Sequence, residues 1–264
     1  MDVSNISPVM DYSLHTEYSA MRRRFDSPFL EPLIILKEAQ RGKVPCLWWN
    51  EGWSYEFCNF IIKLVGWKNP PTVIEIHPPF TDYCETIEDF LGRYSFFERE
   101  IKSIFPDTII LLENRCGTIY TRGNFLVSNC ASVLRIVEGI VKRNLKLKIV
   151  LDIPQLFSAH SLTGNNMSEV KIQKLLRPLR ECHDYIAGIH IWGRKKRNNR
   201  AVAHMGNLDD LFGDKKELKN VFLHEVFELL NDQRPRYFIP EVNSSDEDSI
   251  SIVRDFLDFG FRFI

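Results

Sequence analysis

The sequence predicts an α/β fold, a parallel (β/α) barrel, and three observations lead to that expectation. Short apolar runs of strand length recur along the 264 residues, and a longer segment with helical periodicity follows each run. Near-continuous apolar strands that alternate with amphipathic helices are typical of a parallel sheet covered by helices. No Gly-x-Gly-x-x-Gly follows the first strand, which counts against an open dinucleotide-binding sheet.

The strands are predicted from apolar runs, six of which are clear: 44–49, 72–77, 108–113, 147–153, 185–192 and 236–242. A weaker strand begins the chain near "DYSLHTEYS" (11–19), and the C-terminal "FRFI" (261–264) would be an eighth strand that closes the ring. We therefore expect a TIM (β/α) barrel, in a regular or irregular variant of seven to eight strands, and a single domain over residues 1–264.

The helices are predicted between these strands, at 53–66, 86–104, 126–144, 168–182, 216–232 and 246–258. The third of them has apolar residues at helical spacing from Leu126 to Val141. The segment "SSDEDSI" offers a serine cap and first-turn acids to the last helix. Two long loops are expected, at 114–125 and 193–215.

The composition limits the functional classes. With 34 basic and 35 acidic side chains the net charge is −1, whereas proteins that bind phosphates non-specifically usually carry a basic excess. The six cysteines form no Cys-x-x-Cys pair, which is typical of reduced thiols. No signal peptide is evident, and no apolar stretch approaches the roughly 18–20 residues that span a bilayer. We expect a soluble cytoplasmic protein that does not enter the membrane.

Ionisable residues stand at the ends of five predicted strands, where the active site of a TIM barrel lies. Any one of them is as easily a satisfied buried group, but five at corresponding positions indicate a common site. They are His77, Glu113, Asp152, His190 and Glu241. Carboxylates and imidazole together suit a divalent ion such as Zn²⁺, Mn²⁺, Mg²⁺ or Co²⁺. A cation would also relieve the repulsion among the carboxylates.

The motifs around these residues resemble those of a known family. They are "EIHPP" (75–79), "LLENRCG" (111–117), "VLDIPQLFSA" (150–159), "GIHIWGRKKRNNRAVAHMGNL" (188–208) and "IPEVN" (239–243). In this order they resemble the xylose-isomerase-like TIM-barrel superfamily (AP endonuclease family 2), and more closely its endonuclease IV branch. The resemblance runs from about residue 72 to residue 258.

The resemblance implies a metal centre that is incomplete. Endonuclease IV enzymes hold three zinc ions, and the ligands of one site are matched by Glu113, Asp152, His190 and Glu241. A second metal would share Glu113 and use His77, but its other histidine has no counterpart in "CLWWNEGW" (46–53). The third metal needs a histidine where this chain has Gln155 and an aspartate where Val202 precedes His204. A three-metal phosphodiesterase is therefore disfavoured.

The intact quartet is similar to that of the single-metal sugar isomerases and epimerases of the superfamily. In that chemistry the metal polarises a sugar carbonyl, and Glu113 and Glu241 exchange a proton as base and acid. The residues expected to contact the substrate are Gln155, His204, Arg115, Arg194 and Lys196.

The basic run Arg194–Arg200 carries five cations in seven residues and has two interpretations. It is either an ordinary surface loop or a loop that binds phosphate, on a nucleic acid or on a phosphorylated sugar. In the same way, Trp48, Trp49 and Trp53 are either packing residues of the barrel rim or a stacking platform. His160, His183 and His224 are interpreted as structural.

Three functions therefore stay open. The favoured one is a metal-dependent isomerase or epimerase that acts on a sugar or sugar phosphate. The second is an endonuclease-IV-like phosphodiesterase that acts on DNA or RNA through the 194–200 loop. The third is a barrel without catalytic activity that binds a ligand or a partner.

Overall fold

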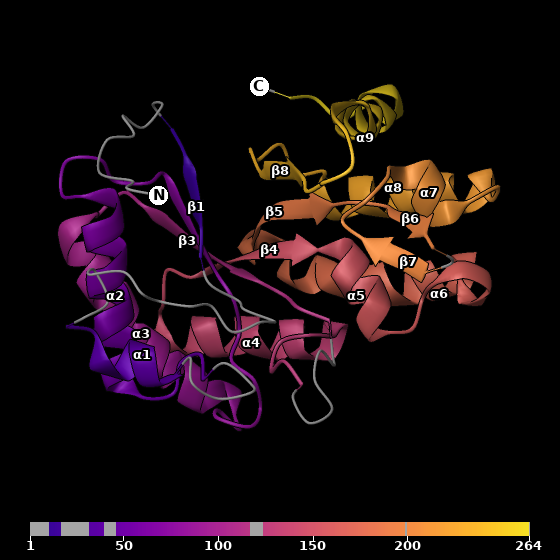
Figure 1. The fold of residues 1–264 in the computed structure, drawn as a ribbon. Coiled ribbons are helices and arrows are strands. Elements are labelled where there is room, and N and C mark those ends of the chain that lie inside the picture. The colour runs from indigo at the N-terminus through magenta and orange to yellow at the C-terminus, as the bar shows by residue number, and fades with distance from the viewer. Residues whose placement is uncertain (1–10, 17–31, 40–45, 117–123, 199, 264) are drawn as a thin grey trace. The chain divides into compact units, whose positions relative to one another are not determined.

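The computed structural model describes residues 11–16, 32–39, 46–116, 124–198 and 200–263 (Figure 1). The chain forms two compact units. Unit 1 comprises Met1–Ser128 and Arg135–Ile149, and unit 2 comprises Asn129–Leu134 and Val150–Ile264. The single domain expected over residues 1–264 stays a prediction.

Unit 1 contains a parallel sheet. Its strands are β1 (Ser13–His15), β2 (Val73–Ile76) and β3 (Ile109–Glu113), and β2 pairs in parallel with both neighbours. All four residues of β2 are buried, as expected for a strand covered on both faces. The weak strand predicted near residues 11–19 is therefore confirmed as β1.

The helices of unit 1 begin where the sequence supplies caps. The Oδ1 of Asn50 accepts the N–H of Trp53 at 2.8 Å and begins α2, and Thr86 caps α3 in the same way. The two helices pack against each other (Figure 1). The helices of this unit are α1 (Ile34–Ala39), α2 (Glu51–Val65), α3 (Ile87–Ile104) and the second part of α4 (Cys130–Arg143).

The strand predicted at 44–49 is wrong for the residues described, since residues 46–50 form turns and bends. Trp48 has a left-handed φ of 56°, and its indole N–H donates to the backbone oxygen of His77 at 2.7 Å. Its ring is buried against Phe90 and Phe97 of α3 at centroid distances of 5.3 and 5.4 Å. The segment is apolar because it packs on a helix. Trp48 and the equally buried Trp53 are therefore packing residues and not a stacking platform.

Unit 2 continues the alternation of strands and helices. β4 (Lys148–Asp152) carries the chain from unit 1 into unit 2, and β5 (Ile186–Ile191) pairs in parallel with β8 (Tyr237–Pro240). The predicted class, α/β with parallel strands and accompanying helices, is confirmed. The helices are α5 (Ile153–Ala159), η3 (Gly164–Asn166), α6 (Glu169–Leu176), η4 (Arg177–Tyr185), α7 (Leu208–Phe212), α8 (Lys216–Leu230) and α9 (Asp246–Phe259).

Local chemistry explains two helix boundaries in unit 2. The helix predicted at 168–182 is α-helical only to Leu176, because Pro178 has no N–H to donate and the 3₁₀ segment η4 takes over. The predicted serine cap of the last helix is confirmed, since the Oγ of Ser245 accepts the N–H of Asp248 at the start of α9. Among the described residues, no helix is long and apolar enough to cross a bilayer.

The loop expected at 193–215 contains regular structure. β6 (Arg194–Arg197) and β7 (Arg200–Ala203) form an antiparallel hairpin, and α7 follows it (Figure 1). Gly193 stands at the base of the hairpin, where its N–H donates to the oxygen of Gly206 at 2.9 Å. A Cβ at this position would lie 2.0 Å from the backbone oxygen of Asn207, so the close approach requires glycine.

The eighth strand predicted from "FRFI" is also wrong, because Phe261–Phe263 are not in a strand. Gly260 ends α9 with a left-handed φ of 110° and turns the chain back. The ring of Phe261 then packs on Phe256 at 4.8 Å, and Phe263 packs on Phe238 at 4.9 Å. These rings are held by side-chain packing and not by strand pairing, and Phe263 stays 43% exposed.

Candidate metal centre

Three of the predicted ligands come together at strand ends of unit 2. Asp152 ends β4, His190 lies in β5 and Glu241 follows β8, and one potential ligand atom from each lies within 4.8 Å of the others. The Nδ1 of His190 is 3.1 Å from the Oε2 of Glu241. His190 pairs in register with Ile239, two residues before Glu241, so the alternation of side chains directs both to one face. We call Asp152, His190 and Glu241 the unit-2 trio.

Asp152 is fully buried, and local structure orients its carboxylate. It caps α5, where its Oδ1 accepts the N–H of Gln155 at 2.8 Å, and Pro154 occupies a first-turn position that needs no donor. Its Oδ2 accepts the indole N–H of Trp192 at 2.9 Å. Both of these donors are neutral, so neither hydrogen bond compensates the charge of an ionised carboxylate.

His204 lies beside the trio, as its position in the sequence motif suggested. Its Nδ1 is 3.4 Å from the Oε2 of Glu241, and its ring stacks on Trp192 at a centroid distance of 4.3 Å. The backbone of His204 has a left-handed φ of 56°, and its oxygen accepts the N–H of Asn243 at 2.8 Å. The end of the hairpin is thereby tied to the segment that follows β8.

A second cluster lies in unit 1 and consists of His15, His77 and Glu113. The Nε2 atoms of His15 and His77 are 3.1 and 2.8 Å from the same oxygen, Oε2, of Glu113. The register explains the second contact, because Ile76 pairs with Leu112 and the next residues are His77 and Glu113. His77 and Glu113 are buried, whereas the side chain of His15 is 34% exposed. We call these residues the unit-1 cluster.

His15 is the site residue that the reading of the sequence missed. A second histidine beside His77, which "CLWWNEGW" does not supply, comes from the first strand, which "DYSLHTEYS" had already indicated. His15 ends β1 just as Glu113 ends β3 and Asp152 ends β4. The strand-end rule, applied to this weak strand too, would have found it.

The charges of the unit-1 cluster favour an ionised glutamate beside a neutral histidine. Burial alone would raise the pKa of Glu113, but His77, His15 and the Arg115 guanidinium hold that pKa well below its usual range. Burial lowers the pKa of His77 to about 4, against the attraction of Glu113. Neutral imidazole and ionised carboxylate are the metal-binding forms of these side chains.

Arg115, predicted to contact substrate, is buried and paired within the protein. Its Nη1 lies 3.0 Å from the Oε1 of Glu113, whereas both histidines face the Oε2. The two oxygens of Glu113 therefore have different neighbours. This pairing gives Arg115 a role in orienting Glu113, and its contact with substrate stays a prediction.

The cations of the basic run that the structure describes in full are also paired within unit 2. The Nζ of Lys195 is 2.6 Å from Asp248 and 3.7 Å from Asp210. The guanidinium of Arg194 hydrogen-bonds the Oγ of Ser158 and lies 5.5 Å from the ring centroid of Trp192. Lys196 is on β6, and its side chain lies outside the described residues. The contacts of Arg194 and Lys195 favour a structural role and give no support to nucleic-acid binding.

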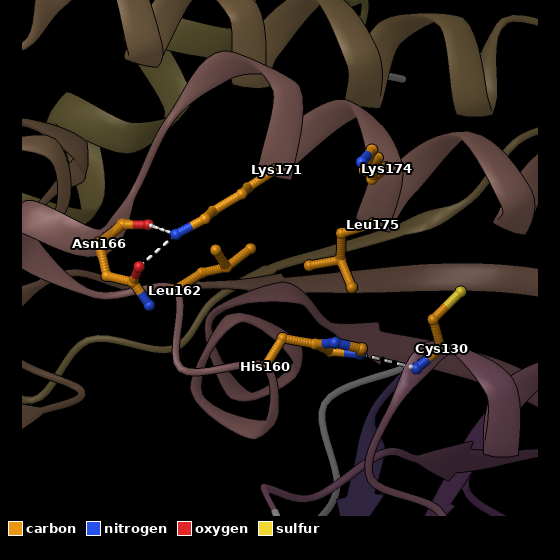
Figure 2. Close-up of a pocket in the computed structure, with 7 residues that line it drawn as sticks. All are labelled: Cys130, His160, Leu162, Asn166, Lys171, Lys174 and Leu175. Atoms are coloured by element: carbon orange, nitrogen blue, oxygen red, sulfur yellow. Dashed lines mark hydrogen bonds between the residues drawn. The ribbon is translucent and has the colours of Figure 1, made fainter.

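A cavity of about 280 Å³ in unit 2 contains none of the predicted site residues (Figure 2). Its lining consists of Cys130, His160, Leu162, Asn166, Lys171, Lys174 and Leu175. The Nε2 of His160 accepts the N–H of Cys130, at the start of α4, over 3.2 Å. This contact supports the structural role predicted for His160.

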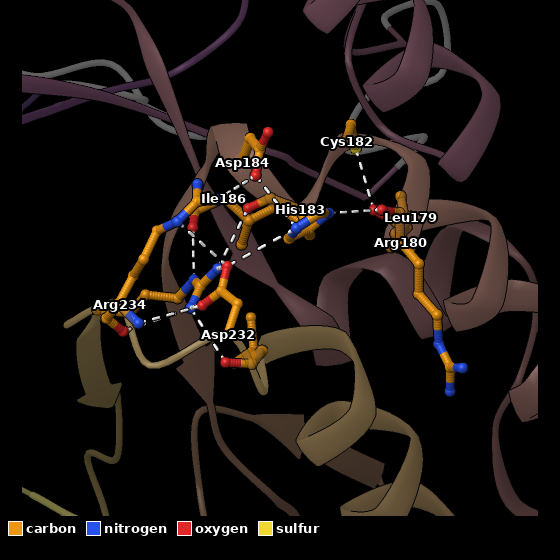
Figure 3. Close-up of polar contacts among 10 residues, drawn as sticks. Leu179, Arg180, Cys182, His183, Asp184, Ile186, Asp232 and Arg234 are labelled. Carbon is orange, nitrogen blue, oxygen red and sulfur yellow. Dashed lines mark hydrogen bonds and ion pairs between the residues drawn. The ribbon is translucent and has the colours of Figure 1, made fainter.

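A third group of metal-ligand types, His183, Asp184 and Asp232, is an ion-pair network (Figure 3). Arg234 contacts Asp184, and the Nη2 of Arg236 lies 2.7 Å from the Oδ2 of Asp232. Hydrogen bonds from Arg236 lower the pKa of Asp232 to about 2. The guanidinium groups already neutralise these carboxylates, so the electrostatic attraction for a metal cation is weak there.

Comparisons with known proteins found no matching family model and no matching curated protein. Among solved structures, a D-tagatose 3-epimerase-like protein is similar at 16% identity and a TM-score of 0.48, over 94% of this chain and 76% of that one. A xylose isomerase domain protein from Alicyclobacillus acidocaldarius is similar at 15% identity and a TM-score of 0.42, over 94% and 74%. Protein SMc04130 from Sinorhizobium meliloti is similar at 12% identity and a TM-score of 0.35, over 79% of this chain and 69% of that one.

Proposed function

We propose that this protein is a divalent-metal-dependent isomerase or epimerase of a sugar or sugar phosphate. The observation that carries the proposal is the unit-2 trio, in which two carboxylates and an imidazole converge at strand ends. This donor set fits a borderline or hard divalent ion such as Zn²⁺, Mn²⁺, Co²⁺ or Mg²⁺. We propose Glu113 as the fourth ligand because of the sequence pattern, in which it is the ionisable residue that ends β3.

In this proposal the residues of the chain bind the substrate and move a proton. When bound, the ion would polarise a carbonyl and acidify the neighbouring C–H group. Glu241, with a side chain that is 27% exposed, can be reached by substrate and would take or return the proton. On the sequence pattern, Glu113 would be the second acid–base residue.

The substrate contacts are proposed from position and chemistry. Gln155 follows Asp152 by one helical turn, and its amide can both donate to and accept from hydroxyl groups. His204 lies next to Glu241 and could bind a substrate oxygen. Arg115, Arg194 and Lys196 complete the proposed set, and Arg194 and Lys196 would bind a phosphate if the substrate carries one.

The proposal is tested by metal content and by proton exchange. Elemental analysis of the native protein should find at least one equivalent of a divalent ion. Incubation with ketoses, aldoses and their phosphates in D₂O should then place deuterium on the carbon next to the carbonyl. Failure to bind any divalent ion would refute the metal centre. A loaded protein that exchanges no substrate proton would refute the isomerase assignment and favour a barrel without catalytic activity.

A second function, metal-dependent phosphodiester hydrolysis, is favoured by one observation, the unit-1 cluster. Two imidazoles on one glutamate oxygen supply ligands for a further ion, and paired ions are suited to activating water and stabilising a leaving oxygen. This hypothesis expects two equivalents of metal and cleavage of a duplex with an abasic site. One equivalent of metal, or two without cleavage, would count against it.

A further inference from the structure

We infer that Trp192 is a positioning residue for the metal centre, and that its indole N–H sets the orientation of the Asp152 carboxylate. The inference rests on the proposed function, because it needs Asp152 to bind a divalent ion. Trp192 follows β5 and is 1% exposed, and Asp152 is 0% exposed. The bond from Nε1 to Oδ2, at 2.9 Å, is therefore shielded from competing water.

The hydrogen bond from Trp192 matters because the other oxygen of the Asp152 carboxylate is also held. The Oδ1 of Asp152 is held by the backbone N–H of Gln155 at 2.8 Å, so a donor on each oxygen restrains the rotation of the carboxylate. Each oxygen retains a lone pair for a cation, since a carboxylate accepts about four hydrogen bonds. With the indole N–H removed, the Oδ2 loses this restraint and the carboxylate can rotate more freely away from the ion. Groups that orient a metal ligand in this way typically contribute about 10- to 100-fold in metal affinity.

Trp192 is itself held in place by the basic hairpin. Its ring stacks on His204 at 4.3 Å with an interplanar angle of 31°, and the Arg194 guanidinium carbon is 5.5 Å from the ring centroid. Gly193 follows directly and is fixed by its bond to Gly206. The hairpin β6–β7 therefore supports the indole from the chain segments on either side of the turn. Arg194 and His204 therefore have a structural role, which is to support the Trp192 ring, and this role is independent of any contact with phosphate.

The test compares two tryptophan variants that differ in one hydrogen bond. Trp192→Phe keeps an aromatic ring and removes the N–H. Trp53→Phe is the matched control, because Trp53 is equally buried and its Nε1 has no hydrogen-bond partner among the described residues. Titration calorimetry with Mn²⁺ or Zn²⁺ alone measures affinity, and thermal unfolding without metal measures stability. We expect about 10- to 100-fold weaker binding for Trp192→Phe and unchanged binding for Trp53→Phe.

A double-mutant cycle separates positioning from general damage. In an Asp152→Asn background the further change Trp192→Phe should leave the remaining metal affinity unchanged, because there is no carboxylate left to orient. If Trp192→Phe binds metal as tightly as the wild type, the positioning role is wrong and the metal centre stands. If the wild type binds no divalent ion, the proposed function fails first and this inference fails with it.

A measurement on the wild type decides the question if Trp192→Phe does not fold. The chain has five tryptophans, so their indole N–H signals can be assigned in an ¹⁵N-labelled sample. Titration with Zn²⁺ should shift the Trp192 signal and leave that of Trp53 in place. A Trp192 signal that does not move as the protein saturates with metal would overturn the inference.

Discussion

His15 ends β1 and His77 directly follows the neighbouring parallel strand β2; their rings are stacked 4.9 Å apart, and both Nε2 atoms contact the same oxygen of Glu113. Sixty-two positions separate the two histidines in the sequence. Neutral imidazoles in this position either donate an Nε2–H to the carboxylate or bind a cation together with it. Burial lowers the pKa of His77 to about 4, and neutral imidazole is the form that binds a metal.

Replacing His15 should remove one metal ion and leave another. His15→Ala affects a partly exposed side chain, so we expect the fold to survive, and metal content after equilibration with Zn²⁺ should fall by about one equivalent. His224→Ala, on the exposed side of α8, is the control. Equal metal content in the wild type and His15→Ala would show that the unit-1 cluster binds no ion.

Replacing the proposed acid–base residues should abolish proton exchange. Because general acid–base groups contribute about 10²- to 10⁴-fold, Glu241→Gln and Glu113→Gln should each slow deuterium incorporation by at least about 100-fold. Glu228→Gln is the control, since its carboxylate is on α8 and lies 4.0 Å from Arg180. Activity retained in either test variant would assign the proton transfer to another residue.

Replacing Lys195 should affect stability and not nucleic-acid binding. Lys195→Ala removes the ion pairs with Asp248 and Asp210. Because such partly exposed pairs contribute up to about 1 kcal/mol, the free energy of unfolding in urea should fall by that order at low salt and by less at high salt. Lys216→Ala, an exposed residue at the start of α8, should have no such effect. A large salt-dependent loss of DNA or RNA binding in Lys195→Ala would restore the nucleic-acid hypothesis.

Asp232 should make the protein sensitive to acid. Its pKa in the folded chain is about 2, below the ordinary 3.8, because Arg236 donates hydrogen bonds to it. A lowered pKa contributes stability that is complete above the ordinary value and is lost as the pH falls towards about 2. The free energy of unfolding of Asp232→Asn should therefore fall less steeply over this range than that of the wild type. Parallel curves for the two proteins would contradict the ion pair.

Much of the fold could be predicted because local periodicity is enough to identify its elements. The apolar runs of β2, β3, β4, β5 and β8 are found within one or two residues of their predicted bounds. The cap at Ser245 was visible for the same reason, since it depends only on neighbours three residues away. Strand ends also identified Asp152, His190 and Glu241, because parallel strands bring their carboxyl ends to one edge.

The sequence by itself therefore determined the alternation of strands and helices, the cap of the last helix and most of the ionisable strand ends. Only the tertiary structure decided which element covers each apolar surface: Trp48 packs on a helix, and Phe261 and Phe263 pack on other rings. It also decided that His15 joins His77, and that Trp192 reaches Asp152 from 40 residues away. The physical reason is that periodicity shows that a face is buried, whereas the partner that buries it is set by packing between residues far apart in the chain.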